Sequence, residues 1–174
     1  SFIIKQKPTK QMFFDHLKGK DPALGIIPIN EKNKCKWSCI DIDLYNGFDH
    51  KELIRKIREY KFPLLVCRSK SGGAHVFLFT DKFVPAALFR NKLKDMAAKL
   101  GYANAEIFPK QNKVDMNKGG TGSFLNLPYH NALLSVRYGI KDDGSAMDIY
   151  QFFEAHSKVK LTEDQLSKLS IQEE

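Results

Sequence analysis

The chain has 174 residues, of which 43% are hydrophobic and 28% are charged, a balance typical of a globular protein with a proper core. No apolar run approaches the roughly 20 residues of a membrane-spanning helix. Three cysteines without a CxxC pair argue against a disulfide framework or a structural zinc site and indicate a reducing compartment. The formal net charge of +8 favours an anionic partner, most commonly nucleic acid, although such a charge can also serve solubility alone.

Helix and strand patterns interleave along the chain. Helical periodicity and capping residues predict helices over 9–19, 49–62, 84–101, 147–156 and 162–169. Runs rich in β-branched and aromatic residues predict strands over 37–45, 63–69, 74–79, 105–109 and 123–129, with a polar, Gly-rich loop over 110–122. The strands are joined partly by hairpins, which predicts an α/β or α+β domain with a mixed or antiparallel sheet.

The domain is expected to extend over residues 1–174, with a helical C-terminal tail over 146–174. The first residues include no initiator Met and no signal-peptide pattern. We therefore expect a cytoplasmic fragment of a longer protein.

Two carboxylates stand in the apolar stretch "CIDIDLY" at 39–45. On a strand, Asp41 and Asp43 would point to the same side, about 6.6 Å apart, while Ile40, Ile42 and Leu44 would point into the core. Carboxylates suit Mg²⁺ or Mn²⁺, and two such ions about 4 Å apart can clamp the oxygens of a phosphoryl transfer. The alternative is a half-exposed edge strand with two solvated acids.

A third acid, Glu106, opens the strand-like run "EIFP" and could complete a three-carboxylate metal site. By itself, the same residue could equally be a strand-end acid that faces water. The pattern therefore predicts a metal site only when the three acids are taken together.

The stretch "RSKSGGAH" at 68–75 gathers groups that can bind an anion. Gly72 and Gly73 permit backbone conformations in which N–H groups converge, and Ser69, Ser71, Arg68 and Lys70 add hydroxyls and charge. His75 opens the next strand on the same side as Phe77 and Phe79. A triphosphate fits this set of groups, although an ordinary Gly-Gly hairpin beside a satisfied histidine would have the same sequence.

The order of these motifs resembles the archaeo-eukaryotic primase superfamily, in the form found in phage and conflict-system primase-polymerases. Asp41 and Asp43 match its first motif, and "SKSGGAH" is similar to its second, triphosphate-binding motif. Glu106 in "EIFPK" stands at the third metal-binding acid, and "GSFLNLPYHN" resembles the strand that follows it. The resemblance covers residues 37–129, and the helical tail agrees with it.

The resemblance implies a two-lobed catalytic core with an RNA-recognition-like mixed or antiparallel sheet flanked by helices. It further implies a divalent-metal-dependent, template-directed nucleotidyltransferase, acting as DNA primase, DNA polymerase or both. The cofactor would be Mg²⁺ or Mn²⁺, bound by Asp41, Asp43 and Glu106. The implied nucleotide-binding residues are Lys70, Ser71, Gly72, Gly73, His75 and Lys110.

The implied partners are a single-stranded DNA template, a primer and dNTP or NTP substrates, with a helicase possible outside this fragment and no membrane. The implied setting is the cytoplasm of a bacterial host cell, with the gene on a phage or mobile element. Two features depart from the family: the third acid is often Asp, and many relatives have a zinc cluster that is missing here. The alternatives are a metal-dependent nuclease, a glycosyltransferase and a non-catalytic nucleic-acid-binding module. The absence of the Glu-x-Lys spacing usual in nucleases argues against the first.

Overall fold

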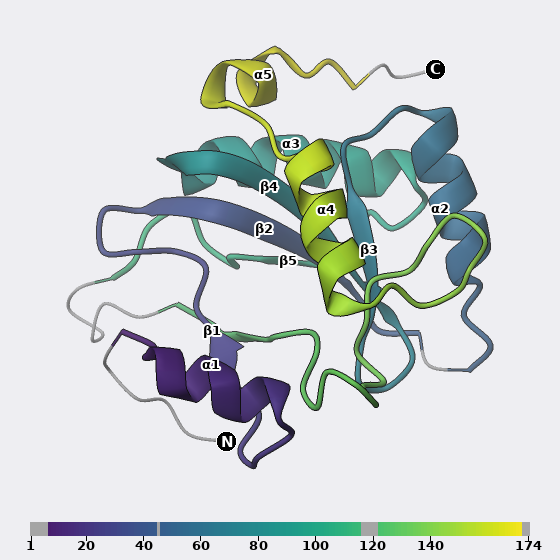
Figure 1. Ribbon diagram of the computed structural model, residues 1–174. Helices are drawn as coiled ribbons and strands as arrows, with labels where there is room; N and C mark the ends of the chain where they lie inside the picture. Colours follow the sequence, from purple (N-terminus) through teal and green to yellow (C-terminus); the bar gives the residue numbers. More distant parts are fainter. Residues whose placement is uncertain (1–6, 45, 116–121, 172–174) are drawn as a thin grey trace.

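The computed structural model describes residues 7–44, 46–115 and 122–171. Its centre is a four-stranded antiparallel sheet in the order β3-β4-β2-β5, and a second sheet pairs β1 with β6 (Figure 1). The strands are β1 (Gly25–Ile26), β2 (Lys34–Ile42), β3 (Leu65–Arg68), β4 (Ala74–Pro85), β5 (Glu106–Phe108) and β6 (Leu125–Asn126). The helices are α1 (Lys10–Leu17), α2 (His50–Glu59), α3 (Ala86–Lys99), α4 (Ile149–Val159) and α5 (Glu163–Lys168).

The four-stranded sheet has a hydrophobic cluster on each face. Alternate side chains of β2, including Ile40 and Ile42, join a core formed with α2 and α3. Cys39 belongs to the opposite cluster, which α4 covers through Phe152 and neighbouring residues. Because successive side chains of a strand point to opposite faces, Asp41 belongs to the α4 side of the sheet.

Local sequence explains where the helices begin. Thr9, Asp148 and Thr162 each accept a hydrogen bond from a backbone N–H of the first turn, and a reciprocal capping box forms at all three sites. Asp49 likewise accepts from the Glu52 N–H, whereas the Glu52 carboxylate accepts hydrogen bonds from Arg55. No helix within the described ranges is long and apolar enough to cross a membrane.

The α+β class, the antiparallel sheet, the expected helices and the hairpin of β3 and β4 are confirmed. Two strand predictions had the wrong bounds. The strand expected over 37–45 ends at Ile42, so Leu44 is 53% exposed instead of buried. The strand expected over 123–129 is reduced to Leu125–Asn126, and part of the polar loop over 110–122 lies outside the described residues.

Candidate functional site

Three residues that are distant in sequence form one row across the central sheet. Asp41 of β2 is the direct cross-strand partner of His75 in β4 and of Glu106 in β5. Direct partners in antiparallel strands project to the same face. The hydroxyl of Ser38 donates to the Phe108 carbonyl at 2.7 Å, a buried bond that holds β5 beside β2. The strand register therefore places one histidine and two carboxylates on the α4 side of the sheet.

Asp41 is the most constrained acid of the site. Its side chain is 15% exposed, and Nε2 of His75 lies 3.3 Å from its Oδ1 atom. That oxygen is buried and has no hydrogen-bond partner among the described residues. A buried carboxylate oxygen without a hydrogen bond is costly, and a catalytic role or a bound ion is one explanation for such an atom in a native protein.

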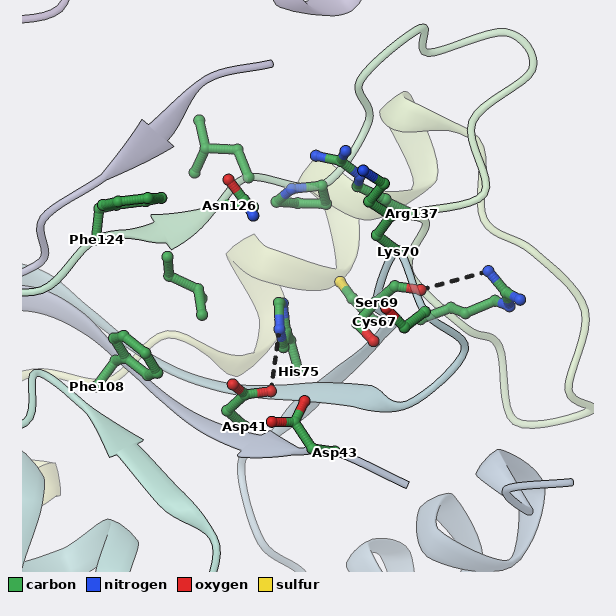
Figure 2. A pocket seen from close by; sticks show the side chains of 15 residues that line it. Asp41, Asp43, Cys67, Ser69, Lys70, His75, Phe108, Phe124, Asn126 and Arg137 are labelled. Carbon is green, nitrogen blue, oxygen red and sulfur yellow. Dashed lines mark hydrogen bonds and ion pairs between the residues drawn. The ribbon is translucent and has the colours of Figure 1, made fainter. Parts of the chain in front are cut away.

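Asp43 lies just beyond the end of β2, so strand geometry alone does not fix its side chain. It nevertheless lines the same cavity as Asp41, and Figure 2 shows the two carboxylates next to each other. Asp41 and Asp43 therefore lie on the same side, as expected. They do so because both line one cavity, and not because both belong to the strand.

Glu106 lies on β5, with a side chain that is 59% exposed. Its carboxylate forms an ion pair with Lys110 Nζ at 3.2 Å, and Lys110 also lies over the Phe108 ring. Within the described residues, no three His, Cys, Asp or Glu side chains gather closely enough for a metal site. The structure thus brings Asp41 and Asp43 together. It places Glu106 on the neighbouring strand, in an ion pair with Lys110.

The turn between β3 and β4 is closed by its own backbone. The Ser69 N–H donates to the Gly73 carbonyl at 3.1 Å, and the Gly72 N–H donates to the Ser69 carbonyl at 3.0 Å. Gly72 has a φ of +93°, which explains the need for glycine there. The motif led us to expect that the Gly72 N–H would donate to an anion. In this conformation it does not, because the N–H is used inside the turn.

Gly73 is required for a different reason. A Cβ atom at this position would collide with the Ile42 carbonyl oxygen, because the turn lies directly against the end of β2. Nε2 of His50 also contacts the Gly73 carbonyl oxygen, at 2.8 Å. The close packing fixes the turn next to Asp43, so Gly73 shapes the site.

Both aspartates, His75 and part of the turn line one cavity of about 230 Å³. Asp41 and Asp43 lie on one side of it, and Lys70 and Arg137 lie on the other (Figure 2). Its remaining lining residues are Cys67, Arg68, Ser69, Ser71, His75, Phe108, Phe124, Leu125, Asn126, Leu127 and Pro128. A cavity with both carboxylates and cations in its wall suits a ligand that carries charges of both signs, such as a metal-bound polyphosphate.

Sequence reasoning missed Arg137. It stands in the irregular segment after "LNLPYHN", where no motif points to it, and only the tertiary fold brings it to the cavity. Arg68 was read as part of the charged turn, but its guanidinium donates to the Val136 carbonyl at 2.9 Å and to the Ser69 carbonyl at 3.3 Å. Arg68 therefore braces the turn through backbone carbonyls.

The fold and the cavity define an α+β domain with a pocket lined by carboxylates and cations on one face of an antiparallel sheet. A family model described as "TOTE conflict system, Archaeo-Eukaryotic Primase domain" matches residues 5–169. The chain therefore belongs to this family of primase-like nucleotidyltransferase domains, as the motifs suggested. No curated protein matches the chain by sequence.

Proposed function

We propose that the chain is a template-directed nucleotidyltransferase that makes or extends primers from nucleoside triphosphates on single-stranded DNA. One observation supports this most directly. Two buried side-chain atoms of the described residues have no hydrogen-bond partner, Asp41 Oδ1 and Arg137 Nη1, and both residues line the same cavity. A metal-bound triphosphate would supply a cation to the first and an anion to the second.

The carboxylates fit a hard divalent cation. Asp41 and Asp43 would hold Mg²⁺ or Mn²⁺, and Asp41 Oδ1 is a buried oxygen that has His75 Nε2 3.3 Å away but accepts no hydrogen bond from the described residues. Such an ion, when bound, neutralises phosphate charge and favours ionisation of the attacking hydroxyl. For Glu106 to join as the third ligand, its carboxylate would have to leave the ion pair with Lys110.

The remaining polar residues would orient the nucleotide. Lys70, Ser71 and His75 line the cavity and would donate to the triphosphate, while Gly72 and Gly73 give the turn its shape. Lys110 lies beside β5 and would contact a phosphate once its bond to Glu106 is released. The partners proposed with this activity are a single-stranded template, a primer and a helicase.

The test is extension by the purified protein of labelled dNTPs and NTPs on single-stranded and primed templates, with Mg²⁺ or Mn²⁺. We expect metal-dependent incorporation that is lost in Asp41→Asn. Template cleavage in place of extension would favour a metal-dependent nuclease that uses the same acids. Template binding without any nucleotide chemistry would favour a non-catalytic nucleic-acid-binding module.

A further inference from the structure

Arg137 is held in place by its backbone. Its N–H donates to the Ser135 hydroxyl at 3.0 Å, and its carbonyl accepts from the Tyr129 N–H at 2.7 Å. Both bonds belong to the main chain of residue 137, so they would survive a change of its side chain. The main chain at residue 137 is therefore held by the loop, independently of any bond that the guanidinium forms.

The guanidinium itself is buried at an energetic cost. Arg137 is 9% exposed, its Nη1 atom is buried without a hydrogen-bond partner, and no carboxylate among the described residues forms an ion pair with it. Burial also lowers the pKa of Arg137 from its ordinary value. An unpaired buried charge is strongly destabilising. The fold thus maintains a cation for which the described residues supply no anion.

Arg68 provides a direct comparison within the same cavity wall. Its guanidinium donates to two backbone carbonyls, those of Ser69 and Val136. Such bonds are what an arginine makes when its role is to support the fold. Arg137 has no equivalent bond from Nη1, which points to a ligand as its missing partner.

The chemistry of nucleotidyl transfer indicates which part of a nucleotide would bind Arg137. A primer 3′-hydroxyl attacks the α-phosphorus, a P–O bond forms, and the α–β bridging bond breaks to release pyrophosphate. The α-phosphate must therefore lie near Asp41 and Asp43. Arg137 and Lys70 lie on the opposite side of the cavity, where the β- and γ-phosphates would extend (Figure 2).

We propose that Arg137 binds the terminal phosphates of the incoming nucleotide and selects triphosphates over monophosphates. The inference rests on the proposed function, because it takes the carboxylates as the reacting end of the site. A guanidinium offers paired N–H donors whose geometry matches a phosphate, which an ammonium cannot reproduce. Arg137 would thus hold the pyrophosphate leaving group.

Calorimetric titration of the protein with dATP, dAMP and inorganic tripolyphosphate, without template, tests this assignment. In Arg137→Gln we expect triphosphate and tripolyphosphate affinity to fall about 10- to 100-fold, the scale of a lost charged hydrogen bond, with dAMP affinity unchanged. Arg137→Lys should recover part of the affinity. Arg58→Gln, which removes the same charge at an exposed site on α2 paired with Asp142, should bind all three ligands as the wild type does.

Thermal unfolding separates a binding role from a structural one. Because Nη1 makes no hydrogen bond to any described part of the chain, Arg137→Gln should be at least as stable as the wild type without ligand. It should also gain less stability than the wild type on addition of tripolyphosphate. A destabilised or unfolded variant whose Arg137→Lys counterpart keeps full triphosphate affinity would assign Arg137 to the fold and overturn the inference.

The two proposals fail in different ways. If the wild type extends primers while Arg137→Gln keeps its preference for dATP over dAMP, the assignment of Arg137 is wrong and the proposed function stands. If the wild type binds tripolyphosphate through Arg137 but extends no primer with any metal, the proposed function is wrong and the assignment of Arg137 to phosphate binding stands.

Discussion

His75 and Asp41 face each other across the pair of β2 and β4, with Nε2 of the histidine 3.3 Å from Oδ1 of the aspartate. The two side chains are 14% and 15% exposed, so both lie largely out of solvent. This contact joins the residue assigned to the triphosphate with the residue assigned to the metal. A change on one strand should therefore affect both functions of the site.

Replacement of either cavity carboxylate should abolish nucleotidyl transfer. Asp41→Asn and Asp43→Asn keep the side-chain volume but remove a negative charge that would face the metal, so we expect incorporation to fall by at least about 100-fold. Asp95→Asn is a matched control, because Asp95 is an exposed acid on α3, across the sheet from the cavity. Incorporation close to the wild-type rate in Asp41→Asn would remove this residue from the catalytic site.

Replacement of His75 should weaken nucleotide binding without changing template binding. His75→Ala removes a polar group that would donate to a charged phosphate, which predicts a loss of about 1.5–3 kcal/mol in the free energy of nucleotide binding. Titration of variant and wild type with a nucleotide and with an oligonucleotide measures the two effects separately. Equal nucleotide affinity in both proteins would exclude His75 from the site.

Much of the fold could be predicted from local sequence. Capping residues such as Thr9 and Thr162 act within one turn of helix, and the periodicity of α2 and α3 reports a buried face directly. The same reasoning placed the end of the strand that contains Asp41 too late, because the alternating pattern continues through Leu44 while the turn at Gly73 packs against the end of β2. Strand ends are set by such tertiary contacts.

The grouping of the candidate residues around one cavity could be predicted only in part, because it also depends on tertiary contacts. Asp41, Asp43 and His75 stand in recognisable motifs; the register of β2 with β4 brings Asp41 beside His75, and Asp43 lines the same cavity just past the strand end. The ion pair of Glu106 with Lys110 depends on side-chain positions that spacing does not reveal. Arg137 depends on the path of an irregular loop, for which the sequence contains no periodic signal.

Substitution of Gly73 should damage both stability and nucleotide binding. Gly73→Ala places a Cβ atom against the Ile42 carbonyl oxygen, so the turn must move, at a cost of about 1–3 kcal/mol in the free energy of unfolding. Gly101→Ala is the control, because Gly101 has a φ of +93° but open space around its Cβ position.

The control should lose about 1 kcal/mol, from backbone strain alone. Urea unfolding measures both losses, and titration with a nucleotide shows whether the turn has been displaced. Nucleotide affinity should fall only in Gly73→Ala. Unchanged stability in this variant would contradict the close packing of the turn on β2.

Acidification should destabilise the protein through His16. This buried histidine accepts a hydrogen bond from the Leu24 N–H at Nδ1, 2.9 Å away, and donates from Nε2 to the Pro128 carbonyl at 2.8 Å, so it is neutral. Burial lowers the pKa of His16 below its ordinary value of 6.5, and His156 is shifted in the same direction.

The unfolded chain therefore binds more protons than the folded protein as the pH falls below 6.5, and the free energy of unfolding decreases in that range. Urea unfolding at a series of pH values measures this slope. His16→Gln cannot be protonated and should show a shallower dependence on pH. Identical slopes in the two proteins would exclude His16 as a source of acid sensitivity.

Template binding should depend steeply on salt. The chain has 28 Lys and Arg against 20 Asp and Glu, so contacts to a single strand are expected to be mainly with phosphates. Each such contact contributes roughly −0.7 to the slope of log affinity against log salt concentration, because it releases condensed counterions. Fluorescence anisotropy with a labelled oligonucleotide over a range of salt concentrations gives the slope and hence the number of contacts.

Asp41→Asn removes no cation and should keep the slope of the wild type while losing extension, which separates binding from chemistry. Affinity that stays constant between low and high salt would contradict a phosphate-based template interface.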